Sequence, residues 1–147
     1  MNYFFIIFIL TFQIHLFGQD KVVEYQYNWP AYNETPPIYP GCNKEAKNHE
    51  LKKCFQEKIS TLISDNFNMN LAKSLGLPDG LIKITTSIKI DTLGNVIDIK
   101  IKAPHDKLAE EAKRVLKLIP NMEQPATYRN KPKTIIQAIP IVFILKN

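Results

Sequence analysis

The sequence is poor in the residues around which catalytic and cofactor sites are built. It contains only two cysteines, three histidines and five glycines among 147 residues. The glycines form no phosphate-binding loop, because Gly76 and Gly80 flank a predicted turn and no Lys-Ser or Lys-Thr pair follows them. Repeats and low-complexity runs are also missing. The sequence therefore argues against a P-loop nucleotide site and predicts no cofactor.

The arrangements that nucleophilic or acid–base catalysis requires are also missing. His49 and His105 are the only histidines beyond residue 19, and both lie among polar residues near expected helix starts. A nucleophile needs a base and an orienting group within reach, and no serine lies in a nucleophile-elbow sequence. The dispersed Asp and Glu residues define no carboxylate pair. We therefore expect recognition rather than enzymatic activity, with no catalytic residue and no metal site.

Charge is missing from the first 19 residues, which are almost wholly apolar from Tyr3 to Phe17. As a helix, this run would be about 23 Å long, which is shorter than the roughly 30 Å hydrocarbon core of a bilayer. A signal peptide over residues 1–19, cleaved near Gly18 or Gln19, is the expectation, and a retained membrane anchor is the alternative. Membrane attachment is expected only if the leader is retained.

The rest of the chain carries all of the formal net charge of +5. Its lysines are spread over every expected element instead of forming one cluster, and export would separate the chain from nucleic acid, so we expect no nucleic-acid partner. A basic surface of this kind is attracted to acidic partners or anionic lipid. About 128 residues are enough for one domain.

The two cysteines, Cys42 and Cys54, both lie in the part expected to be exported. In an oxidising compartment, an even pair predicts a disulfide. It would close a loop of about 11 residues, which the chain-entropy model values at somewhat under about 3 kcal/mol. His49 lies between the cysteines, so a zinc site of Cys42, His49 and Cys54 is the alternative, although it lacks a fourth ligand and the usual paired spacing.

The first half of the exported part predicts an extended arm followed by helices. Residues 20–41 are rich in tyrosine and proline, which favours an arm laid on the domain. An apolar period typical of a helix runs from Glu45 or Asn48 to Phe67, with Asn48 available as the N-cap. A second short helix is expected over residues 69–75.

The second half predicts a hairpin followed by a helix. Residues 91–95 suit a bulged hairpin loop. The strands on either side of this loop alternate between two faces. One face of the first strand holds Ile82, Ile84, Thr86, Ile88 and Ile90, and one face of the second holds Ile97, Ile99 and Ile101. A helix is expected over residues 105–119. The outer side of this helix holds Glu110, Glu111, Lys113 and Arg114, and we expect it to be solvated. Glu110 lies four residues before Arg114, the spacing of a weak ion pair on a helix surface. Pro125 and Pro132 predict an irregular segment after it.

A final strand is expected over residues 133–145. It contains Pro140, which cannot donate to a ladder, so the strand should lie at a sheet edge. One face holds Ile135, Gln137, Ile139, Ile141, Phe143 and Leu145. The opposite face is unusually apolar at Ile136, Val142 and Ile144, so either the arm or a partner is expected to cover it. The whole order predicts an α+β fold.

These segments, in this order, resemble the C-terminal domain of TonB, the periplasmic energy transducer of Gram-negative bacteria. The matching residues are Pro37-Ile38-Tyr39-Pro40-Gly41-Cys42, Cys54-Phe55, Ile88-Lys89-Ile90-Asp91-Thr92-Leu93-Gly94-Asn95-Val96, Ala103-Pro104-His105, Leu108, Glu111-Ala112-Lys113-Arg114-Val115, Pro120-Asn121-Met122, Lys131-Pro132 and Ile139-Pro140-Ile141-Val142-Phe143. The resemblance implies a domain over residues 42–147, with a three-stranded antiparallel sheet and two to three helices packed on one face.

In that family the last strand is an edge that accepts the "TonB box" of an outer-membrane TonB-dependent receptor by strand addition. The resemblance therefore implies a periplasmic protein that binds a peptide along a partner-strand edge consisting of Thr134, Ile136, Ala138, Val142 and Ile144.

Two alternatives to a periplasmic binding domain remain open. One is an energy transducer anchored in the inner membrane, and the other is a structural protein that pairs with itself, for instance as a homodimer. Residues 20–41 reach at most about 75 Å when fully extended, which is short for a spacer between two membranes. We therefore expect binding without energy transduction.

Overall fold

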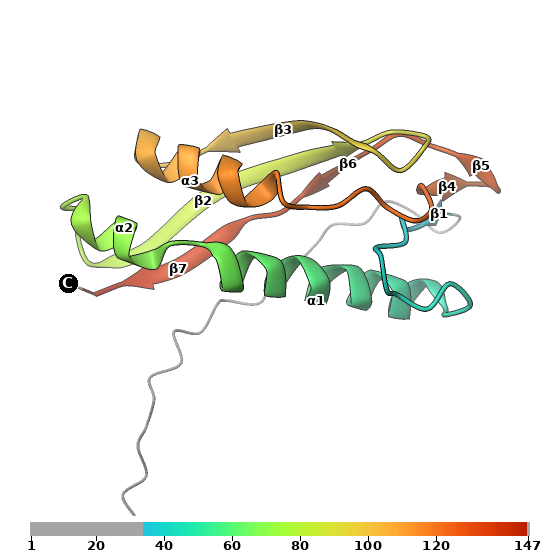
Figure 1. Ribbon diagram of the computed structural model, residues 1–147, viewed down its shortest axis with the longest axis horizontal. Helices are drawn as coiled ribbons and strands as arrows, with labels where there is room; N and C mark the ends of the chain where they lie inside the picture. Colours follow the sequence, from blue (N-terminus) through green and yellow to red (C-terminus); the bar gives the residue numbers. More distant parts are fainter. Residues whose placement is uncertain (1–33, 147) are drawn as a thin grey trace, which may run out of the picture.

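The computed structural model describes residues 34–146, which form an α+β fold with two antiparallel sheets and three helices (Figure 1). The expected signal peptide, residues 1–19, and residues 20–33 of the expected arm lie outside the described residues. The α+β prediction is confirmed, and the expected sheet with helices agrees broadly with the observed arrangement.

The main sheet has β2 (Gly80–Ile90) at its centre. On one side β2 pairs with β3 (Val96–Lys102), and on the other it pairs with β6 (Ile135–Ala138) and then β7 (Ile141–Leu145). One register runs through both of these last strands, from Ile90 opposite Ile135 to Gly80 opposite Leu145. β6 and β7 are therefore two halves of the expected final strand, and among the described strands they occupy the predicted edge.

The expected single strand over residues 133–145 is interrupted at Ile139-Pro140, so that prediction was wrong in detail. Proline has no N–H for the ladder. At this point the Ile139 N–H donates to the Thr86 carbonyl at 2.9 Å, and the Thr86 hydroxyl donates to the Ile139 carbonyl. The hydroxyl of Thr86, buried among isoleucines, thus has its hydrogen-bond partner.

The hairpin between β2 and β3 has the predicted loop over residues 91–95, but its bulge lies within β3 and not in the loop. Lys89 lies opposite Asp98 and Ile90 opposite Val96, so Ile97 is the extra residue. Ile97 is 53% exposed, whereas Ile99 and Ile101 pack partly buried against the core. The prediction that Ile97 shares their face was wrong, because the bulge shifts the alternation by one residue.

Two features of the hairpin loop favour glycine at position 94: a positive φ and the close approach of Met122. Its φ is +88°, and its carbonyl accepts a hydrogen bond from the Met122 N–H at 2.8 Å. A Cβ atom at this position would lie 2.8 Å from the Met122 carbonyl oxygen, which is backbone and cannot move aside cheaply. The loop and the segment after α3 therefore meet at a glycine that also needs a left-handed conformation.

We expect Gly94→Ala to lower the free energy of unfolding by about 2–3 kcal/mol, combining left-handed strain with the contact against Met122. Gly76→Ala is the matched control, since Gly76 has φ +66° but no atom within 4 Å of an added Cβ. That control should lose only about 1 kcal/mol. Urea unfolding of both variants measures the difference, and equal losses would show that the Met122 contact contributes nothing.

The helices begin and end close to the predicted residues, with one capping error. α1 (Asn48–Asn66) is capped by Lys47, whose N–H donates to Glu50 at 2.9 Å. Asn48 is not the N-cap, because it is already helical and its side-chain amide donates to the Glu34 carbonyl at 3.0 Å. α2 (Met69–Ser74) follows Asn68.

α3 (Asp106–Leu116) begins after His105, whose Nδ1 accepts a hydrogen bond from the Lys107 N–H at 3.1 Å. It ends three residues before the expected Ile119. The Leu118 and Ile119 N–H groups donate to carbonyls only three residues back, so the chain tightens into a turn before Pro120.

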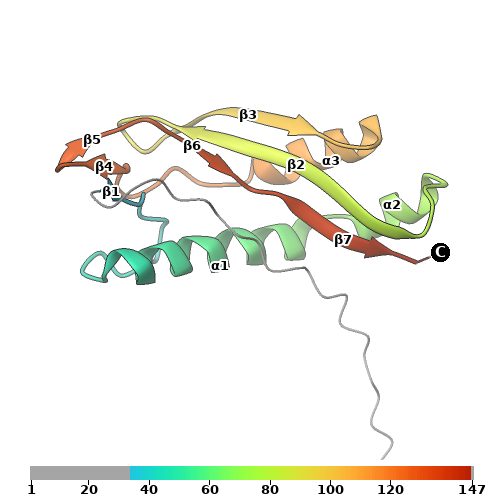
Figure 2. The same cartoon turned by 180° about the vertical axis from the view of Figure 1, so that it is seen from behind.

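The core lies between the main sheet and the helices on one of its faces. Figures 1 and 2 show α3 on one side of the sheet, with α1 running beside it along β7. α1 buries Leu51, Phe55, Ile59 and Ile63, and α3 buries Leu108, Ala112, Val115 and Leu116. The inward side chains of the sheet complete the core: Ile82, Ile84, Ile88, Ile90, Ile139, Ile141, Phe143 and Leu145.

A second, small sheet was not predicted. It consists of β1 (Glu34–Thr35), β4 (Thr127–Tyr128) and β5 (Lys131–Pro132), and the last two are joined by Arg129 and Asn130, both with positive φ. The expectation of an irregular segment was wrong here, because Pro132 lies in a strand of only two residues where one missing N–H costs little.

Candidate interaction edge

The disulfide predicted from the two cysteines is present. Cys42 and Cys54 are bonded, with their Cα atoms 6.0 Å apart. The bond ties the segment before α1 to that helix, where the buried Tyr39 packs edge-on against Phe55 at 6.2 Å between ring centroids. Both sulfur atoms are therefore taken, and His49 is an exposed residue of α1. Within residues 34–146, no three His, Cys, Asp or Glu side chains are grouped to hold a metal ion.

The edge formed by β6 has backbone groups that point away from β2. The Ile139 N–H donates to the carbonyl of Thr86 in β2. Hydrogen-bonded and non-hydrogen-bonded pairs alternate along an antiparallel ladder. The odd-numbered residues of β6 therefore bond β2, and the N–H and carbonyl groups of Ile136 and Ala138 face outward. No other described strand lies against this side of β6.

The side chains of these residues also point away from the core. Ile136 is 67% exposed and Ile144 is 50% exposed, while Thr134 and Ala138 are exposed. Val142 is half-buried and makes a further interaction, so the site does not depend on it. The fold thus exposes four of the five predicted edge residues: Thr134 just before β6, Ile136 and Ala138 in β6, and Ile144 in β7.

Gln137 modifies this edge in a way that the sequence did not indicate. It is buried on the inner face, yet its side-chain Nε2 donates to the Ala138 carbonyl at 3.1 Å. A carbonyl oxygen has two lone pairs, so Ala138 still has acceptor capacity for an incoming N–H. The amide of Gln137 partly satisfies the edge when no strand is added.

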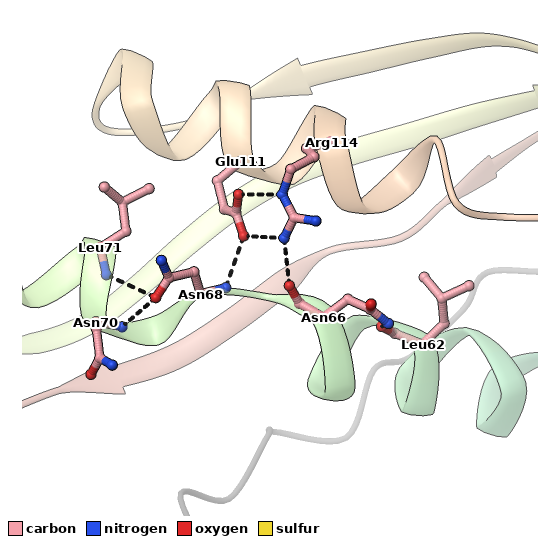
Figure 3. Close-up of polar contacts among 7 residues, drawn as sticks. All are labelled: Leu62, Asn66, Asn68, Asn70, Leu71, Glu111 and Arg114. Atoms are coloured by element: carbon pink, nitrogen blue, oxygen red, sulfur yellow. Dashed lines mark hydrogen bonds and ion pairs between the residues drawn. The ribbon is translucent and has the colours of Figure 1, made fainter.

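A buried carboxylate on α3 holds the joint between α1 and α2 (Figure 3). Glu111 is only 9% exposed and accepts from the Asn68 N–H at 2.8 Å and from Arg114 Nε and Nη2 at 2.8 and 2.7 Å. Arg114 Nη2 also donates to the Asn66 carbonyl at 2.6 Å. The bonds to Arg114, followed by that to the Asn68 N–H, lower the pKa of Glu111 against the opposing effect of burial.

The prediction that the charged side of α3 is solvated was therefore wrong at Glu111. The predicted Glu110–Arg114 pair is replaced by Glu111–Arg114, three residues apart. The sequence shows Glu111 on the charged side of an isolated helix, and only the packing of the α1–α2 joint against α3 covers it. Asn68 takes part in this joint twice, because its N–H donates to Glu111 while its side chain caps α2 by accepting from the Asn70 and Leu71 N–H groups.

Between residues 34 and 146, none of the helices is both long and apolar enough to cross a bilayer. The disulfide is compatible with an exported protein.

The fold and this edge define a small α+β domain with an exposed strand. No family model matches the chain, and no match was found among curated proteins or solved structures.

Proposed function

We propose that the protein is a periplasmic, non-enzymatic TonB-like binding domain that accepts an extended peptide by strand addition along β6 and β7. The observation that carries this proposal is the outward backbone of Ile136 and Ala138 on an edge strand. An added strand would form main-chain hydrogen bonds there, and the exposed side chains would select its residues.

The resemblance to the TonB C-terminal domain supports this proposal, because that family uses its last strand in the same way. The order of α1, hairpin, α3 and edge strand agrees with it. The disulfide supports an oxidising compartment. The proposed ligand class is the TonB box of an outer-membrane TonB-dependent receptor.

Titration of the ¹⁵N-labelled protein with synthetic TonB-box peptides tests the proposal. We expect amide shifts along residues 134–144, centred on Ile136 and Ala138. Ile136→Pro removes one outward N–H and should weaken binding about three- to tenfold, the worth of one main-chain hydrogen bond. Ile136→Ala keeps the N–H and is the matched control.

Shifts confined to other elements would contradict strand addition at this edge, as would equal binding by the two Ile136 variants. Urea unfolding of each variant confirms that the fold is retained. If light scattering shows that the chain already dimerises through this edge and peptides do not compete, self-association replaces peptide binding as its function.

A further inference from the structure

We infer that the outer face of the main sheet docks on an anionic lipid surface. We define the outer face by the side chains that point away from the helices: Leu81, Lys83, Thr85, Ser87, Lys89, Asp98, Lys100, Lys102, Ile136, Ala138, Val142 and Ile144. No described helix lies on this side of the sheet (Figure 2). The inference does not depend on the proposed peptide binding.

Large apolar side chains stand at both ends of the outer face. Leu81 is 64% exposed and lies directly opposite Ile144, which is half exposed. Ile136, the most exposed of the three, lies at the other end of the same edge. At about 3.4 Å per residue, Ile136 and Ile144 are roughly 27 Å apart along the strands. Two apolar contact points therefore lie far apart on one surface.

Between and beside these apolar residues lie four lysines: Lys83, Lys89, Lys100 and Lys102. None of them makes an ion pair within the described part of the chain, whereas Asp98 is the only carboxylate on the outer face. Elsewhere in the described part of the chain, three lysines pair with a glutamate: Lys44, Lys53 and Lys133. The outer face thus presents four positive charges against one negative charge.

The mixture of a few exposed apolar residues with lysines favours lipid over a folded protein partner. The buried centres of protein–protein interfaces are depleted of lysine, because its strongly hydrated ammonium group is costly to desolvate. At a bilayer surface the same side chain lays its apolar stem along the interface and keeps its ammonium group among anionic headgroups. Leucine and isoleucine beside it enter the boundary of the acyl chains.

Vesicle co-sedimentation of the chain recovered after export tests the inference. Vesicles of equimolar phosphatidylglycerol and phosphatidylcholine are compared with vesicles of phosphatidylcholine alone. We expect binding only to the anionic vesicles, weakening as salt is added. The variant K83Q/K100Q/K102Q should bind at least about tenfold more weakly, because each lysine near an anionic surface contributes about fivefold. Leu81→Ser with Ile144→Ser should also weaken binding.

K107Q/K113Q/K117Q is the matched control, since it removes three exposed lysines on or beside α3, on the opposite side of the sheet. It should bind as the unaltered chain does. Equal losses in the two triple variants would overturn the inference, as would equal binding to both kinds of vesicle or none to either. Lysine-dependent binding of polyglutamate without vesicle binding would assign the outer face to an acidic protein instead.

These outcomes are separate from those of the peptide titration. An added strand extends the sheet in its own plane, whereas lipid would cover its face. Peptide shifts at Ile136 and Ala138 without vesicle binding would leave the proposed function intact, and vesicle binding without peptide shifts would leave the lipid inference intact.

Discussion

Replacing Glu111 by alanine is expected to lower the free energy of unfolding by about 2–4 kcal/mol. The substitution leaves the Asn68 N–H without its acceptor and Arg114 without the carboxylate that receives two of its hydrogen bonds. Both groups lie where α3 meets the α1–α2 joint, so the loss should loosen all three helices. Guanidinium unfolding measures the difference.

Glu110→Ala is the matched control for this prediction. Glu110 is the adjacent residue of α3, is exposed, and is the residue that the sequence paired with Arg114. Its removal should change the free energy of unfolding by less than about 0.5 kcal/mol. If the two variants lose the same amount, the buried carboxylate has no special role.

The same carboxylate gives the effect of Glu111→Ala a definite pH dependence. Because its hydrogen bonds lower the pKa of Glu111 in the folded protein, its stabilisation is fully present above the unfolded pKa of about 4.3. It is lost as the pH falls through the lower folded pKa. The difference between the unaltered protein and Glu111→Ala should therefore be constant from pH 7 to about pH 5 and shrink in more acidic solution. A difference in the free energy of unfolding that grows on acidification would contradict a lowered pKa of Glu111 in the folded protein.

Loss of the disulfide is the second large effect. The double variant Cys42→Ser, Cys54→Ser should have a free energy of unfolding lower by about 2–3 kcal/mol, because the unfolded chain regains the freedom of a loop of about 11 residues. The folded protein also loses the tie that holds Tyr39 against Phe55. Urea unfolding with and without dithiothreitol measures the effect.

The reductant supplies an internal control. It should lower the stability of the unaltered protein to that of the double variant and leave the double variant unchanged. Lys44→Ala, which removes only the exposed ion pair with Glu123 beside the bond, should cost less than about 1 kcal/mol. If the double variant has the same free energy of unfolding as the oxidised protein, the disulfide does not stabilise the fold.

Most of the fold was predictable because its elements carry simple periods. The isoleucines of β2 alternate, and the apolar residues of α1 recur every three or four positions, so the buried faces of both could be assigned before any contact was known. Pro140 predicted an edge from one missing donor, and the last strand does lie at the edge of the described sheet.

The sequence-based predictions were wrong at positions where contacts with distant residues override the local preference for a helix, strand or turn. A bulge of one residue exposes Ile97, and two residues with positive φ create the β4–β5 hairpin in a segment that the prolines marked as irregular. Asn48 has the chemistry of an N-cap, yet Lys47 begins the helix and the Asn48 side chain is taken by Glu34. Nothing in the local sequence fixes which of two adjacent residues meets a distant partner.

The α+β class, the cysteine pairing and the two faces of the final strand follow from the sequence alone, because periodicity and the missing proline donor are properties of consecutive residues. Contacts between distant residues, in contrast, bury Glu111, bring Gly94 against Met122, and group four lysines with Leu81, Ile136 and Ile144 on a sheet face that no described helix covers. These features depend on strand register and on helix packing between residues far apart in the chain. Burial and the grouping of charges depend on which surfaces meet, and the whole fold determines which surfaces meet.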